Sequence, residues 1–157
     1  MSRSKKPRRH YDPSRLFHCV AARQERKTAA RPLDLSQTND IGLAYHLSFS
    51  AVQGGYATEE AWSQLACSMN IAMLLAEQGI GGERLGDIRN AQDALMRAKA
   101  RGERTGTWGL DGDGIRDLRA AITAHDAQMA TATKAQVRAA ISEMHRRMNS
   151  GDVLEVR

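Results

Sequence analysis

The stretch WSQLACSMNIAMLLA, residues 62–76, decides the fold of this chain. Its apolar residues recur every three or four positions, as on one face of an α-helix: Trp62, Leu65, Ala66, Met69, Ala72, Met73 and Ala76. In its second half Ile71, Leu74 and Leu75 add apolar side chains on the other faces. A helix that is apolar nearly all round is buried, so we predict that this stretch is the central helix of a helical domain.

The residues at both ends of this stretch are typical of helix termini. Thr58 is a good N-cap, and Glu59 and Glu60 follow in the first turn, where the helix dipole favours acids. Gly79 is expected to end the helix.

A second apolar stripe with helical spacing precedes the central helix: Ile41, Ala44, Tyr45, Ser48 and Val52. Leu47 and Ala51 are expected to widen its buried face. Three residues before it are candidate N-caps: Ser36, Thr38 and Asn39. The pair Gly54-Gly55 is expected to stop this helix.

Three more stripes follow the central helix. The first ends at Gly102 and comprises Leu85, Ile88, Ala91, Gln92, Leu95, Ala98 and Lys99. The second, entered from a turn in which Asp111 or Asp113 caps the helix, comprises Ile115, Leu118, Ile122, His125 and Met129. The third comprises Val137, Ala140, Ile141, Met144 and Met148. Thr133 and Gln136 have the spacing of a capping box, which indicates a break, yet one long helix from about 114 to 149 fits the composition equally well.

These stripes predict an all-α fold, a bundle of four to five helices over residues 32–157. No run of β-branched and aromatic residues indicates a strand, and aromatics are only 4% of the chain. The longest apolar run, Ile71 to Ala76, is far shorter than the roughly 20 residues that a membrane span needs. We therefore expect a protein without a membrane-spanning helix.

Positive charge is concentrated at the N-terminus. Residues 1–31 hold ten of the 23 Lys and Arg residues but two of the 18 acidic ones, a net charge of +8. The remaining 126 residues hold 13 basic and 16 acidic residues, a net charge of −3. We interpret residues 1–31 as a flexible basic N-terminal arm attached to a mildly acidic helical domain. Such asymmetry suggests a polyanionic partner.

Within the arm, residues 1–13 lack aliphatic side chains after the initiator, and Pro7 and Pro13 disfavour helix, so disorder is expected there. Residues 16–22 form a short apolar cluster, predicted to be one helical turn or a strap on the domain. The candidate nucleic-acid-binding residues are five cations and one aromatic: Arg3, Lys5, Lys6, Arg8, Arg9 and Tyr11. Cations neutralise phosphates without a fixed fold, and tyrosine stacks on bases. A solvated tail, or an arm that docks on an acidic protein surface, is the competing interpretation.

A second basic cluster lies near the end of the third predicted helix: Arg97, Lys99, Arg101 and Arg104. Together with Trp108 it is a possible extension of a nucleic-acid surface. Cations that stabilise a helix C-terminus, beside a tryptophan that anchors a loop, explain it better. Arg146 and Arg147 have the same two interpretations.

No pattern in the sequence indicates a catalytic or metal site. The Asp111–Gly114 turn lacks the glycine and glutamate positions of a calcium loop. The histidines and the cysteines Cys19 and Cys67 lack the spacing of metal ligands. His125 lies on an apolar stripe and is interpreted as a satisfied core or interface histidine. We therefore expect no enzyme activity, no metal and no cofactor.

Three segments resemble a group of small basic proteins from bacterial phages, prophages and mobile elements: KKPRRHY at 5–11, AMLLAEQGIG at 72–81 and TGTW at 105–108. Members of this group are largely uncharacterised, and some carry labels as regulators. The resemblance implies a cytoplasmic accessory or regulatory protein, and it implies no catalytic residue.

Charge and resemblance together predict a small regulatory protein whose arm binds DNA or RNA non-enzymatically. The alternative is a protein-binding adaptor or inhibitor that acts on a host complex, or on a second copy, through its helical faces.

Overall fold

The structure, a computed structural model, describes residues 13–150, with side chains from residue 21 onward except at position 35. These residues form six α-helices and one short 3-10 helix: α1 (Pro13–Ala29), α2 (Leu35–Gln53), α3 (Glu59–Glu77), η1 (Gly82–Arg84), α4 (Leu85–Thr105), α5 (Gly112–Thr131) and α6 (Lys134–Asn149). The all-α class is confirmed, but the number of helices is six rather than four to five.

The additional helix is α1, which lies in the segment interpreted as the arm. A single turn or a strap was expected here, whereas the structure has a helix of 17 residues that begins at Pro13. Proline fits the first helical position because its missing N–H is not needed there. The Ala, Arg, Gln, Glu and Lys residues that follow have high helix propensity.

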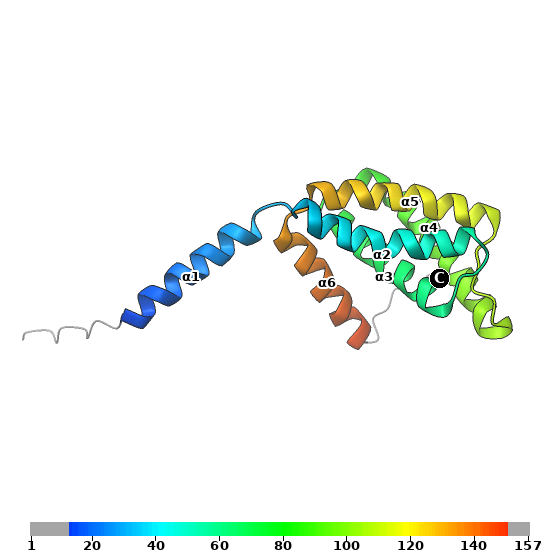
Figure 1. Ribbon diagram of the computed structural model, residues 1–157, viewed down its shortest axis with the longest axis horizontal. Coiled ribbons are helices and arrows are strands. Elements are labelled where there is room, and N and C mark those ends of the chain that lie inside the picture. The colour runs from blue at the N-terminus through cyan, green and yellow to red at the C-terminus, as the bar shows by residue number, and fades with distance from the viewer. Residues whose placement is uncertain (1–12, 151–157) are drawn as a thin grey trace, which may run out of the picture.

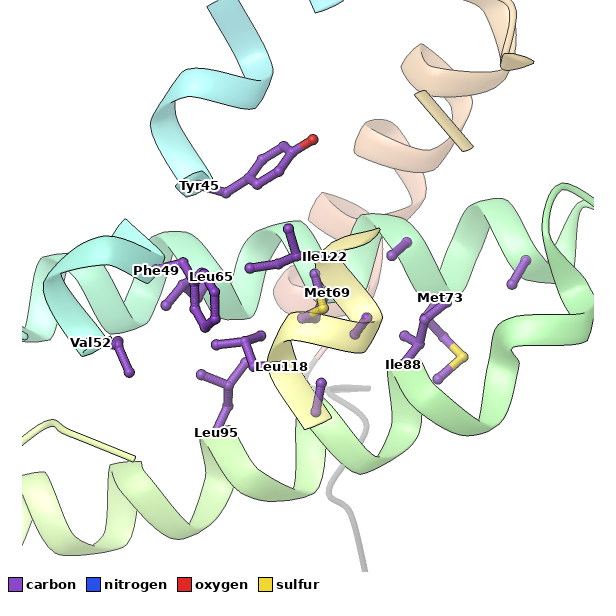
Figure 2. Packing of buried hydrophobic residues seen from close by; sticks show 14 residues of the cluster. Tyr45, Phe49, Val52, Leu65, Met69, Met73, Ile88, Leu95, Leu118 and Ile122 are labelled. Carbon is purple, nitrogen blue, oxygen red and sulfur yellow. The ribbon is translucent and has the colours of Figure 1, made fainter. Parts of the chain in front are cut away.

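Helix α3 is the centre of the bundle, as its composition predicts. It packs against α2, α4, α5 and α6 (Figure 1). Leu65, Met69, Ala72 and Leu75 are fully buried along it. Figure 2 shows Phe49, Leu65, Leu95, Leu118 and Ile122 gathered between α2, α3, α4 and α5.

A second, smaller core lies between α3 and α6. It consists of residues from α3, α6 and the end of α5: Leu74, Leu75, Met129, Ala132, Val137, Ala140 and Met144. This cluster explains why the second half of the central stretch is apolar on several faces. One face meets α2, α4 and α5, and another meets α6.

The structure confirms the predicted break between α5 and α6. Ala132 is extended, with φ −64° and ψ 142°. Thr133 and Gln136 form a capping box: the Thr133 hydroxyl accepts from the Gln136 N–H at 3.3 Å, and the Gln136 side chain accepts from the Thr133 N–H at 2.9 Å. One continuous helix over 114–149 is therefore wrong.

Three other local expectations are corrected. The N-cap of α2 is Asp34, whose carboxylate accepts from the Gln37 N–H at 2.9 Å, rather than Ser36, Thr38 or Asn39. Leu47 does not widen the buried face of α2, since 61% of its side chain is exposed. Helix α4 runs through Gly102 and ends before Gly106, which has the positive φ of 74° typical of a C-cap glycine.

The remaining helix ends follow the sequence signals. Thr58 caps α3, Asp111 caps α5, and Gly54 caps the end of α2. Gly79 follows the end of α3 with φ +87°. No helix within residues 13–150 is long and apolar enough to cross a membrane.

Candidate functional site

The six residues that the sequence marks as nucleic-acid contacts lie outside the part of the chain that the structure describes: Arg3, Lys5, Lys6, Arg8, Arg9 and Tyr11. The structure therefore leaves their role as a prediction. It does describe the rest of the basic segment, from α1 to Arg31.

Helix α1 projects away from the bundle (Figure 1). It packs against α6 near its own C-terminal end, where the chain enters the domain. At this junction the Lys134 N–H donates to the Arg31 carbonyl at 3.0 Å, and Pro32 forms an isolated bridge with Thr133. The base of α1 is thus tied to the start of α6, while residues 23–25, further from the junction, are exposed.

From residue 21 onward the exposed surface of α1 carries three cations and one acid, Glu25. Arg23, Arg26 and Lys27 are exposed on the helix, and Arg31 is exposed just after it. Among the described residues no ion pair involves any of these four side chains. We call Arg23, Arg26, Lys27 and Arg31 the α1 cation set. They are available to an external anion.

A groove between α1 and α6 adds to this surface. Its lining includes three small side chains, three cations and one acid: Ala21, Ala22, Ala29, Arg26, Lys134, Arg138 and Glu25. The Lys134 ammonium lies 3.6 Å from the Asp34 carboxylate and is partly neutralised. The groove is partly open to solvent, and Arg26 and Arg138 are the lining cations that lack an ion pair within the described part of the chain.

Three of the four cations in the second basic cluster contact other groups of the protein, and the fourth, Arg104, is exposed. Arg97 lies 3.9 Å from Asp111, and Lys99 lies 3.7 Å from Glu103. The guanidinium of Arg101 donates to the Gly109 carbonyl. These contacts support the interpretation of this cluster as a stabilised helix end.

The tryptophan beside this cluster anchors its loop. The Trp108 ring lies directly over Gly102 and 5.6 Å from the Trp62 ring. The Trp62 indole N–H donates to the Leu95 carbonyl at 2.7 Å. The Trp108 side chain is therefore half-buried against the helices and is not free to stack on a base.

The cations at the end of α6 are also paired. Arg146 and Arg147 both donate to the Glu143 carboxylate, at 2.7 and 2.8 Å, and these bonds lower the pKa of Glu143 to about 2. Arg147 also donates to Glu77 on α3 at 2.9 Å, which raises the pKa of the Arg147 guanidinium. This network ties α6 to α3.

Sequence reasoning missed a polar cluster that joins α2 to α5. The Tyr45 hydroxyl donates to the Asp126 carboxylate at 2.5 Å, and His46 Nε2 lies 3.1 Å from the same oxygen. Burial, and then the hydrogen bond to Asp126, raise the pKa of Tyr45. Asp126 is 81 residues from Tyr45 and 80 from His46, so no local spacing in the sequence predicts these contacts.

Beside this cluster lies His125, which was correctly interpreted as a satisfied core histidine. Its ring is 1% exposed, with Nδ1 3.2 Å from the Gln128 side-chain oxygen and the ring centroid 5.2 Å from that of Tyr45. The Gln128 amide in turn donates to the carbonyls of Ala72 and Ile80, at 3.0 and 2.8 Å. Burial lowers the pKa of His125. These bonds stabilise the packing of α5 on α3.

Within residues 13–150 no group of three or more His, Cys, Asp or Glu side chains is arranged to hold a metal ion. Cys67 is a free, half-buried thiol.

No family model, curated protein or solved structure matches this chain. The resemblance to phage and mobile-element proteins accordingly stays an expectation from the sequence. The site must be interpreted from its own chemistry.

Proposed function

We propose that this protein binds nucleic acid without catalysis, and that α1, with the basic residues that precede it, makes the phosphate contacts. The observation that carries the proposal is the α1 cation set, which is exposed on a projecting helix and has no carboxylate partner among the described residues. The competing interpretation is an arm whose cations are neutralised by the domain's own acids. The four side chains of the α1 cation set give it no support.

The distribution of charge over the whole chain favours a polyanion over an acidic patch on a single partner. A segment with a net charge of +8 precedes a domain with a net charge of −3. The acidic domain is repelled by phosphate while the basic segment is attracted. The expected complex therefore has the arm against the nucleic acid and the domain held away from it.

Duplex DNA fits α1 better than duplex RNA does. A helix with its side chains is about 10–12 Å across, and the major groove of B-DNA is about 12 Å wide. The major groove of an A-form RNA helix is too narrow for a helix. The 17 residues of α1 span about 25 Å, enough to follow the groove over several base pairs.

Binding should depend strongly on salt, because each phosphate contact releases a counterion. In the triple variant Arg23→Gln, Arg26→Gln, Lys27→Gln we expect at least about tenfold weaker binding to a short duplex. The slope of log K against log salt should flatten by about 1 for each lost phosphate contact. Fluorescence anisotropy with a labelled duplex, over a range of salt concentrations, measures both quantities.

A matched control removes three exposed cations from the domain: Arg89→Gln, Arg104→Gln and Arg116→Gln. This variant has the same net charge as the triple variant of α1 but keeps the α1 cation set. We expect it to bind DNA nearly as tightly as the unmodified chain. Equal losses in the two variants would mean that general charge, and not α1, attracts the DNA.

The biological role that we propose is accessory: regulation of gene expression from a mobile element, by a protein without enzyme activity. A single-stranded RNA and an RNA duplex of the same length serve as competitors in the same experiment. Preference for either RNA over duplex DNA would contradict insertion of α1 into a major groove.

A further inference from the structure

The outer face of α2 exposes large apolar side chains. Leu43 is 60% exposed and Leu47 is 61% exposed. They are four residues apart and therefore adjacent on the same face. Burial of such side chains is favourable, so an exposed pair on a regular helix makes this face a candidate contact surface.

Tyr56 extends this surface beyond the end of α2. It is 67% exposed, and its ring lies directly against Gly54, where a Cβ would collide with it. Position 54 is eleven residues after Leu43, three helical turns along the same face. We call Leu43, Leu47 and Tyr56 the α2 stripe.

Helix α2 itself carries almost no charge. Asp40 is the single Lys, Arg, Asp or Glu in the 19 residues of α2. The other exposed side chains beside the stripe are uncharged and polar: Ser36, Asn39, Ser50 and Gln53. His46, which also lies on this side, is bonded to the half-exposed Asp126 carboxylate of α5, which is a second acidic charge at the edge of this face.

This chemistry limits what binds the stripe. Nucleic acid needs cations, and the face has none. A charged peptide would leave its charges unpaired there, which costs free energy. The complementary surface is another uncharged helix face with apolar residues, and α2 of a second copy is such a face.

We propose that two copies of this chain associate through their α2 helices. In an antiparallel pair related by a two-fold axis, Leu43 of one copy lies beside Leu47 of the other. Asp40 then faces the neutral Ser50, whereas parallel pairing would place the two Asp40 carboxylates together. Antiparallel helix dipoles favour the same arrangement.

A single pair of helices buries less than the roughly 1,200–2,000 Å² of a standard stable interface. The dimer is therefore weak and depends on concentration. Salt strengthens it, because salt screens the repulsion between two chains that each carry a net charge of +5. DNA binding responds to salt in the opposite direction, so the two processes are separable.

The test is sedimentation equilibrium of the full chain without nucleic acid, from low to high micromolar concentration. We expect the mean mass of the unmodified chain to rise with concentration toward that of a dimer. The double variant Leu43→Glu, Leu47→Glu should stay monomeric over the same range, with a dissociation constant at least about tenfold higher. The variant Met148→Glu, at an apolar side chain 52% exposed on α6, should dimerise like the unmodified chain.

Circular dichroism shows whether the double variant is folded. NMR of the unmodified chain over the same concentration range tests the interface without any substitution. Amide signals of residues 43, 47 and 56 should shift with concentration while those of α4 stay fixed. A chain that is monomeric at every concentration overturns the proposal and leaves the α2 stripe to a different protein. A double variant that dimerises as well as the unmodified chain also overturns it.

Discussion

Gly102 is needed for the space that it leaves rather than for stopping a helix. It is buried within α4, and a Cβ there would lie 2.5 Å from Trp108 Cδ2. The tryptophan ring occupies the place of a side chain, which holds the α4–α5 loop against the bundle. The glycine is visible in the sequence, but its contact with a residue in the following loop is not.

We predict that Gly102→Ala destabilises the protein by about 1–3 kcal/mol, because the methyl group displaces Trp108. Gly86→Ala in the same helix is the control, since no atom lies within 4 Å of a Cβ there. That change should leave stability unchanged or raise it by less than about 1 kcal/mol, because Gly86 lies in the first turn of α4. Urea unfolding followed by circular dichroism measures both, and equal effects at the two positions would contradict this role of Gly102.

His125 makes the stability of the fold depend on pH. Burial lowers its pKa in the folded chain, whereas the unfolded chain has an ordinary histidine. Between those two pKa values the unfolded state binds more protons. The contribution of neutral His125 is therefore complete above the pKa of the unfolded chain, about 6.5, and declines as the pH falls below it.

We predict that the free energy of unfolding decreases below neutral pH by up to about 1.4 kcal/mol per pH unit from this one group. His125→Gln should flatten the slope even though it lowers stability overall. The exposed His145→Gln should leave the slope unchanged. Urea unfolding at a series of pH values measures the slopes; an equally steep slope in His125→Gln would assign the effect to other groups.

At the scale of the elements, the capping box at Thr133 decides where α5 ends and α6 begins. It allows the chain to turn at Ala132, which is fully buried in the smaller core. The sequence contained this signal, but the surrounding residues were equally good helix formers. Packing of α6 on α3 favours the bent arrangement over a straight helix, because only the bend buries the apolar face of α6.

We predict that Thr133→Ala destabilises the protein by about 1 kcal/mol, because Ala lacks the oxygen that accepts from the Gln136 N–H. Thr133→Ser should retain most of the stability. Thr123→Ala is the control, because that hydroxyl bonds only to the Arg119 carbonyl of its own helix. Thermal and urea unfolding of the three variants test this, and an unaffected Thr133→Ala would show that packing alone fixes the break.

Helix positions were predictable because the apolar stripes and caps are local. Thr58, Asp111 and Gly54 each act through bonds to residues a few positions away. The prediction that Leu47 is buried was wrong, because apolar spacing shows which residues share a helix face but not whether another helix packs on that face. On α2 the tertiary structure buries Tyr45 and Val52 and leaves Leu47 exposed.

At the scale of the whole molecule, charge and shape act together. The domain gathers around α3, while α1 extends from one end of it (Figure 1). Several cations of the domain near α4 and α6, among them Arg97, Arg101 and Arg147, are held by carboxylates and carbonyls of the protein itself, whereas Arg89 and Arg104 are exposed. The α1 cation set lies apart from them, and this separation makes nucleic-acid binding a sharper proposal than total charge alone supports.

The sequence by itself determined the all-α class, the buried central helix and the asymmetry of charge, because periodicity, caps and composition are properties of the chain. The tertiary structure decided that α1 stands away from the bundle, that Asp126 meets Tyr45 and His46, and that no residue between 13 and 150 covers the α2 stripe. Each of these depends on which distant segments come together. That choice depends on the packing of all the helices at once, which no local pattern encodes.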